Sequence, residues 1–131
     1  MRQRFDMLVP LDLTVSSNRT AERWKRQKVK NAMRALTRTH AAGLYPCGSA
    51  SIYVGLVKRT AGKYDPQNTS DTWKGLADEL VDMGVLDGDD YQHVLGPLAY
   101  HHGIDRDLPT GYLRAVVTLT DYAPIPLAVE L

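Results

Sequence analysis

Residues 65–90 read DPQNTSDTWKGLADELVDMGVLDGDD, and their pattern of apolar and acidic side chains decides the fold that we predict. Apolar residues recur in it at helical spacing, which predicts a buried stripe along a helix over residues 69–83, ending at Gly84. The stripe consists of Trp73, Leu76, Ala77 and Leu80. The opposite face carries Asp71, Lys74, Asp78 and Asp82. We therefore expect a helix that covers a sheet with one face and exposes a charged face.

The segments around this helix supply the strands. Residues 112–120 form the clearest strand, because Leu113, Val117 and Leu119 lie among branched neighbours. Further strands are predicted over 4–13, where Pro10 marks an edge or end, over 49–57, and over 93–100, which Gly96-Pro97 interrupts or ends. A helix over 21–42 followed by Gly43, and a loop over 60–67, complete the order β-α-β-α-β-β. This order predicts an α+β fold, a single domain over 1–131 with a mixed four-stranded sheet and two helices, and residues 121–131 as an extended tail or dimer arm.

Composition narrows the class of protein. The chain has 131 residues, enough for one domain, and its hydrophobic fraction of 44% and charged fraction of 24% are those of a soluble protein. No apolar run approaches the roughly 18 residues of a membrane span, and the first ten residues lack the features of a signal peptide. Cys47 is the single cysteine, so an intrachain disulfide is excluded. We expect a cytoplasmic protein with no membrane partner.

The net charge of +1 conceals two halves of opposite sign. Residues 1–63 carry 13 Lys/Arg and 3 Asp/Glu, whereas residues 64–131 carry 3 Lys/Arg and 12 Asp/Glu. A basic surface attracts phosphates, and an acidic cluster attracts cations. A polyanion bound beside a cation site is the arrangement that a metal-dependent nuclease requires.

The predicted first helix is strongly basic. Between residues 19 and 40 there are eight Lys/Arg and one acid, Glu22. Arg26, Lys30, Arg34 and Arg38 follow one another at four-residue intervals, and such like-charge pairs mildly destabilise a helix. Bound phosphates would offset this repulsion, so the pattern favours contact with DNA or RNA over a merely solvated face. For Trp24 and Tyr45 we expect packing rather than stacking on bases.

The segment over residues 65–90 is correspondingly acidic, with eight acids against the single Lys74. Crowded carboxylates repel one another, and a divalent ion such as Mg²⁺ relieves that repulsion. The alternative is a solvated acidic helix followed by a polar turn. Asn68 and Asp71 suit the start of the helix, as cap and first-turn acid.

These residues resemble a known motif. The run Asp65-Pro66-Gln67-Asn68, then Lys74, Asp78-Glu79-Leu80, Gly84 and Asp89-Asp90 is similar to the core motif of the RusA-type Holliday junction resolvases, especially those of bacteriophages. That motif is roughly D-x-D-N, a lysine, an aspartate four residues later and a closing Asp-Asp pair. The strand into Pro10, Ser17-Asn18-Arg19 and Trp24 also fit, so the resemblance covers about residues 4–120. Gln67 replaces the second aspartate, and the interval from Asn68 to Lys74 is longer; Asp71 could supply the missing carboxylate, or fewer ligands could hold the metal.

The resemblance implies a homodimeric, Mg²⁺-dependent endonuclease, with Mn²⁺ as a substitute, that nicks opposing strands of a four-way DNA junction in recombination, repair or phage DNA processing. It implies action in the cytoplasm, that of the host if a phage encodes the chain. The implied metal ligands are Asp65, Asp78, Asp89 and Asp90, and the catalytic residues are these four with Lys74. The expected DNA-binding residues are Asn18, Arg19, Arg23, Lys25, Arg26, Lys30 and Asn68.

Other readings of the sequence remain open. Gln67 motivates a DNA-binding protein that does not cleave, and a nuclease of broader specificity for branched DNA is a third possibility. A zinc site built from His93, His101 and His102 is disfavoured, because the chain shows no repeated ligand spacing. His93 lies close to Asp89-Asp90 in sequence, and we expect it to have a structural role at the strand edge.

Overall fold

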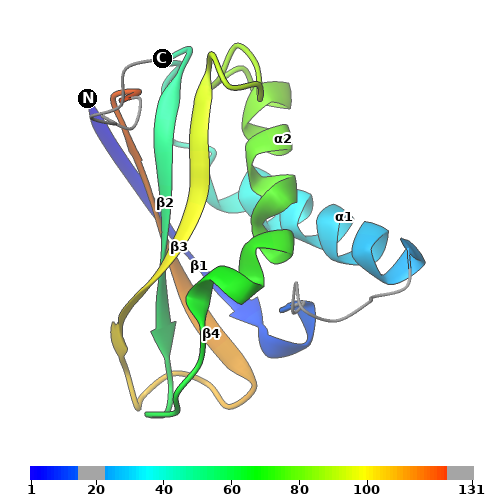
Figure 1. The fold of residues 1–131 in the computed structure, drawn as a ribbon, viewed down its shortest axis with the longest axis vertical. Helices are drawn as coiled ribbons and strands as arrows, with labels where there is room; N and C mark the ends of the chain where they lie inside the picture. Colours follow the sequence, from blue (N-terminus) through cyan, green and yellow to red (C-terminus); the bar gives the residue numbers. More distant parts are fainter. Residues whose placement is uncertain (15–22, 124–131) are drawn as a thin grey trace, which may run out of the picture.

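The computed structural model describes residues 1–14 and 23–123, which form a mixed α+β domain (Figure 1). Its strands are β1 (Arg2–Pro10), β2 (Ala50–Lys58), β3 (Val94–Ile104) and β4 (Tyr112–Thr120). Its helices are α1 (Arg23–His40) and α2 (Lys74–Asp82), with short 3₁₀ helices η1 (Leu11–Leu13) and η2 (Pro66–Trp73). The predicted fold class, with four strands in a mixed sheet and two α-helices, is confirmed.

The four strands lie in the order β1-β4-β2-β3. β4 pairs antiparallel with β1 and with β2, so that Val117 lies opposite both Phe5 and Val54. β2 and β3 are parallel, with Val54 opposite Ala99. A parallel pair requires a long crossover, and η2 with α2 supplies it. The segment with the resolvase-like motif is therefore the connection that returns the chain from the end of β2 to the start of β3.

Both α-helices cover the same face of the sheet (Figure 1), and the core lies between them and the strands. Met7, Val54 and Val117 point into this core from three neighbouring strands. The predicted stripe on the acidic helix is confirmed, because Trp73, Leu76, Ala77 and Leu80 are all buried. α1 buries only Val29, Met33 and Thr37, as expected for a mostly exposed helix. Trp24 and Tyr45, which we expected to pack, are in fact 65% and 54% exposed.

The predicted helix over 69–83 is in fact two consecutive helices. The Asp65 carboxylate accepts a hydrogen bond from the backbone N–H of Gln67 at 3.0 Å, and Pro66 follows it. This cap starts a 3₁₀ helix at Pro66, inside the expected loop, and the α-helix begins only at Lys74. Asn68 is therefore not the helix cap that the sequence indicated. Gly84, at φ +79°, follows the C-cap Met83, in agreement with the predicted helix end.

Three other boundaries differ from the predicted ranges. β1 ends at Pro10, the residue that the sequence marked as an edge or end of the strand, and residues 11–13, which were expected to continue it, turn into η1. α1 ends at His40 rather than at residue 42. β3 continues through Gly96-Pro97 to Ile104, because it is an edge strand whose pairing with β2 shifts register between Ser51 and Tyr53. Proline is tolerated at such an irregular edge, where its missing N–H removes no regular ladder bond.

None of the helices in the described ranges is both long enough and apolar enough to span a membrane. Most of the predicted C-terminal tail, from residue 124 onward, lies outside the described residues.

Candidate functional site

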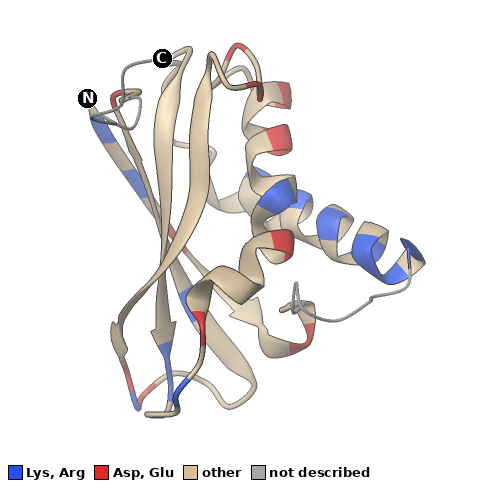
Figure 2. Cartoon of the chain, viewed as in Figure 1, with Lys and Arg blue, Asp and Glu red and all other residues tan. Residues whose placement is uncertain are grey.

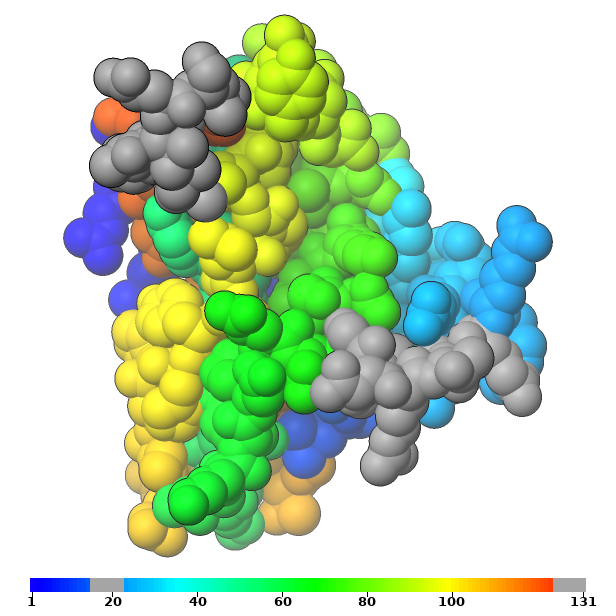
Figure 3. Space-filling view, in the orientation of Figure 1, coloured from blue at the N-terminus to red at the C-terminus, as the bar shows by residue number. Residues whose placement is uncertain are grey.

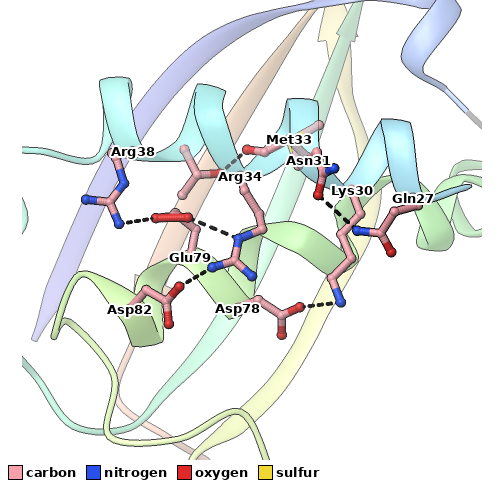
Figure 4. A network of polar contacts seen from close by, with 10 residues as sticks. Gln27, Lys30, Asn31, Met33, Arg34, Arg38, Asp78, Glu79 and Asp82 are labelled. Carbon is pink, nitrogen blue, oxygen red and sulfur yellow. Dashed lines mark hydrogen bonds and ion pairs between the residues drawn. The ribbon is translucent and has the colours of Figure 1, made fainter.

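The basic helix α1 and the acidic helix α2 lie against each other, and ion pairs join them (Figure 4). Lys30 Nζ lies 2.8 Å from Asp78 Oδ2, and Arg34 Nε lies 3.1 Å from Glu79 Oε1. Arg34 also pairs with Asp82, and Arg38 Nη2 lies 2.6 Å from Glu79 Oε2. The facing blue and red segments of Figure 2 show this match of opposite charges. Acids of the same chain thus offset the repulsion along α1, which the sequence had assigned to bound phosphates.

Glu79 lies at the centre of this network. Its side chain is only 5% exposed, and two guanidinium groups contact its two oxygens. Burying a carboxylate is costly unless it is paired and hydrogen bonded. Oε1 accepts a hydrogen bond from Arg34 Nε, whereas the buried Oε2 is ion-paired with Arg38 but accepts no hydrogen bond from a described residue. Since its oxygens already contact arginines, Glu79 fixes α2 against α1 rather than serving as a free ligand.

Asp78 stands next to Glu79 but has different partners. Burial raises the pKa of Asp78, but hydrogen bonds with Lys30 and with the Asp89 carboxyl, together with the positive charges of Lys30 and Arg34, outweigh burial and leave the pKa below its usual value. Asp89 follows α2 in the sequence, so the loop after the helix folds back onto the helix's polar face. Neighbouring carboxylates repel each other, and a cation close to both relieves that repulsion. Asp78 and Asp89 are therefore the candidate cation site.

Asp90 orders the loop beside this pair. Its carboxylate accepts a hydrogen bond from the backbone N–H of Gln92 at 2.9 Å and lies 2.8 Å from Nδ1 of His93. The hydrogen bond with His93, followed by that with Gln92, lowers the pKa of Asp90. A side chain at Gly88 would approach His93 Nδ1 to 2.9 Å, so the loop needs glycine there. The structure thus places His93 against an acid and gives Asp90 a structural partner.

Asp65 lies away from the other predicted ligands. It caps the start of η2, whereas Asp89 and Asp90 follow the end of α2 (Figure 2). The axial rise of η2 and half of α2 places Asp65 on the order of 20 Å from Asp78. Within residues 1–14 and 23–123, no group of three or more His, Cys, Asp or Glu side chains is arranged to hold a metal ion. One chain therefore brings Asp78 and Asp89 together and leaves Asp65 apart.

A basic groove lies beside the Asp78–Asp89 pair, with a volume of about 210 Å³. Its lining residues are Arg23, Arg26, Gln27, Lys30, Asp71 and Lys74. Lys74 Nζ lies 2.9 Å from Asp71 Oδ1, so Lys74 pairs with the acid three residues before it, while Asp78 pairs with Lys30. Lys30 both lines the groove and binds Asp78, and it therefore connects the two features.

The predicted DNA-binding residues divide into three groups. Arg23, Lys25 and Arg26 are exposed on α1 and form no ion pair with another described residue. Lys30 is paired with Asp78, and Asn68 is half-buried in η2, where its backbone N–H donates to Asp65 O at 3.1 Å. Asn18 and Arg19 lie outside the described residues.

Sequence reasoning missed one further polar cluster at the opposite end of β2. The Tyr64 hydroxyl lies 2.6 Å from Nδ1 of His101, and Lys58 Nζ lies 4.8 Å from the centre of the Tyr64 ring. An open cavity of about 520 Å³ adjoins Tyr64 and His101. No pattern of spacing could have found this pair, because only the crossover between β2 and β3 brings the two residues together.

Comparison with known proteins gives no assignment: no protein-family model matches the chain, and no curated protein matches its sequence.

Proposed function

We propose that this protein is a metal-dependent endonuclease that resolves four-way DNA junctions in recombination, repair or phage DNA processing. The observation that carries the proposal is the position of Asp78, which lies 2.8 Å from Lys30 of a basic groove and next to the Asp89 carboxyl group. The same two aspartates belong to the resolvase-like motif, as does Lys74 of the groove. In this proposal the protein acts as a homodimer. It acts in the cytoplasm, which is that of the host cell if a phage encodes the chain.

The donor set suits a hard divalent ion. Mg²⁺ is commonly held by one or two protein carboxylates, with waters and substrate phosphate oxygens completing its coordination, so Asp78 and Asp89 meet its minimum requirement. A bound Mg²⁺ would activate a water molecule and stabilise charge on the scissile phosphate. In this proposal Asp90 and His93 hold the loop that presents Asp89, and Lys30 orients Asp78.

The basic groove supplies the phosphate contacts of the proposal. Arg23 and Arg26 have no ion-pair partner among the described residues and are available to the DNA backbone. Lys74 lies across the groove on α2, where its ammonium group can contact both Asp71 and a DNA phosphate. A positively charged donor in this position would stabilise the negative charge that develops on the phosphate during attack. Asp65, which caps η2, keeps the ligand role that the motif implies only if a rearrangement or a second copy brings it to this site.

A cleavage assay on a synthetic four-way junction tests the proposal. The wild-type protein is expected to nick the junction in Mg²⁺ or Mn²⁺ and to be inactive in a chelator. Asp78→Asn and Asp89→Asn should lose cleavage while still binding the junction. Asp82→Asn is the matched control, because Asp82 is on the same helix but pairs with Arg34. Absence of wild-type cleavage, or full activity in both Asp78→Asn and Asp89→Asn, rejects a nuclease that uses this pair.

One observation favours a second candidate, a junction-binding protein that does not cleave. Lys30 already neutralises Asp78 at 2.8 Å, so a divalent ion would have to compete with this lysine. Gln67, where the motif has an aspartate, points the same way. Tight junction binding with no nicking in either metal, unchanged in Lys30→Met, would favour this candidate over the nuclease.

A further inference from the structure

The two tryptophans of the chain differ sharply in exposure. Trp73 is fully buried in the core, whereas Trp24 is 65% exposed. A large indole that is mostly exposed in the free protein can bury apolar surface against a flat partner, so Trp24 is a candidate contact residue. Val29, Met33 and Thr37 make the buried side of α1, and Trp24 is not part of it.

The surroundings of Trp24 are basic. Arg23, Lys25, Arg26 and Lys28 lie within four residues of it, and all four are exposed. None of the four forms an ion pair with another described residue, in contrast to Lys30, Arg34 and Arg38 further along the same helix. The uncompensated charge of α1 is therefore concentrated at the end that carries Trp24. This end projects from the body of the molecule (Figure 3).

The geometry of the helix places Trp24 beside the basic groove. Arg23, Arg26, Gln27 and Lys30 line the groove, at the spacing of one helix face. Trp24 follows Arg23 by one residue, which turns it about 100° around the helix, onto the neighbouring face. A strand whose phosphate lies in the groove can thus place the adjoining base against the indole.

We propose that Trp24 is a stacking platform for an unpaired nucleobase of a DNA strand whose backbone is held by Arg23 and Arg26. Bases inside a duplex are already stacked on both faces, so the platform suits a single strand or an opened base at a branch point. The inference deepens the proposed function, on which its choice of DNA as partner rests. It names the part of a branched substrate that the protein recognises.

Intrinsic fluorescence tests this directly, because Trp73 is shielded in the core and Trp24 is accessible. DNA is titrated in a chelator, so that cleavage plays no part. The probes are a single strand, a duplex, a four-way junction, and a strand of the same length carrying abasic sites. Quenching of the exposed tryptophan is expected with the single strand and the junction, and much less with the abasic strand. Equal quenching and equal affinity for normal and abasic strands would overturn the inference.

Variants separate stacking from charge. Trp24→Ala is expected to weaken binding to a single strand by about 5- to 150-fold, the usual loss for one stacked base, whereas Trp24→Phe should keep most of the affinity. Tyr45→Ala is the matched control, since Tyr45 is an aromatic residue that is 54% exposed but lies beside Gln3, beyond the end of α1 opposite to Trp24. The emission of Trp73 checks that each variant is folded. Unchanged affinity in Trp24→Ala contradicts the inference.

Two results distinguish this inference from the proposed nuclease. Base-dependent quenching by a protein that never cleaves supports the platform and rejects the nuclease. Junction cleavage that Trp24→Ala leaves unchanged, with unchanged binding, supports the nuclease and rejects the platform. A blue shift of Trp24 emission on raising the protein concentration without DNA would mean that a second copy covers the indole, and this also overturns the inference.

Discussion

At the scale of single residues, the role of each acidic side chain on α2 depends on the groups of the same chain with which it pairs. Glu79 is buried and contacts two arginines, whereas its neighbour Asp78 is shared between Lys30 and Asp89. Adjacent acids on one helix thus have separate roles. Glu79 joins two helices, and Asp78 belongs to the pair that suits a cation.

Arg34 should be the most important cation for stability. Arg34→Met leaves Arg38 as the one remaining ion-pair partner of Glu79 among the described residues and also removes the pair with Asp82. Since the buried Glu79 carboxylate loses its hydrogen-bonded partner while Arg38 remains, we expect the free energy of unfolding to fall clearly, although less than for a fully buried pair because Arg34 is partly exposed. Urea unfolding measures it. Arg23→Met is the control and should change stability by less than about 0.5 kcal/mol; equal losses would show that the network contributes nothing specific.

Asp6 gives a pH-dependent contribution to stability. The Arg4 side chain donates hydrogen bonds to both carboxylate oxygens of Asp6 at 2.9 Å. This hydrogen bond outweighs burial and, with the charges of Arg4, Arg114 and His102, lowers the pKa of Asp6. A carboxyl group with a lowered folded pKa stabilises the fold above its unfolded pKa of about 3.9 and loses that contribution as the pH falls through its folded value.

We therefore expect wild type to lose more stability than Asp6→Asn when the pH falls from about 5 to 2. Unfolding free energies at several pH values measure the difference. Asp107→Asn, which changes an exposed aspartate outside the ion pairs of the described residues, should keep the wild-type profile. Identical profiles for Asp6→Asn and Asp107→Asn would contradict the assignment.

At the scale of elements, sequence patterns succeeded where the cause is local. The stripe Trp73, Leu76 and Leu80 was predictable because helical spacing alone decides which side chains share a face. The end of α2 at Gly84 was predictable for the same reason. The start of α2 was not predictable, because the Asp65 carboxylate accepts a hydrogen bond from the backbone N–H of Gln67 and so caps a 3₁₀ helix that begins eight residues before α2. The full length of β3 depends on pairing with β2, which lies about 45 residues earlier in the chain, so local sequence patterns do not reveal it.

The candidate site also has features that the sequence predicted and features that it did not. Asp78, Asp89 and Lys74 were named from the resemblance to the resolvase motif, and the structure places the first two next to each other. The pairing of α1 with α2 was missed, because charge counts along one helix cannot reveal that another helix neutralises it. The separation of Asp65 from Asp89 was missed as well. Asp65 precedes the η2–α2 crossover and Asp89 follows it, and the sequence does not reveal that the two ends of this crossover lie apart in space.

Binding of a divalent ion by Asp78 and the loop after α2 should raise the free energy of unfolding of the domain. If Asp78 and Asp89 hold the ion, adding Mg²⁺ at about ten times its Kd stabilises the folded state by about 1.4 kcal/mol, because only the folded chain offers the pair. Thermal melting with and without Mg²⁺ measures this. Asp89→Asn should lose the shift and Asp82→Asn should keep it. A shift of the same size in all three proteins would show that the ion binds elsewhere.

At the scale of the whole molecule, the opposite charges of the two halves of the sequence meet at the α1–α2 contact, where Lys30, Arg34 and Arg38 pair with acids of α2 (Figures 2 and 4). The charge that remains for a polyanion is therefore smaller than the sequence indicates. It is concentrated in Arg23, Lys25, Arg26 and Lys28 at the exposed end of α1. The molecule thus presents a localised basic end next to an acidic pair, rather than a uniformly basic helix.

This arrangement predicts the salt dependence of DNA binding. Each cation that contacts a phosphate adds about 0.9 to the slope of log K against log salt, so about four free cations should give a slope near −4. Lys25→Met should reduce the slope by about one, whereas Arg38→Met should leave it nearly unchanged, because Glu79 already neutralises Arg38. Fluorescence anisotropy of a labelled junction in a chelator, over a series of KCl concentrations, measures both slopes. Equal reductions would mean that DNA competes with Glu79 for α1, and that the helix pair opens when the protein binds.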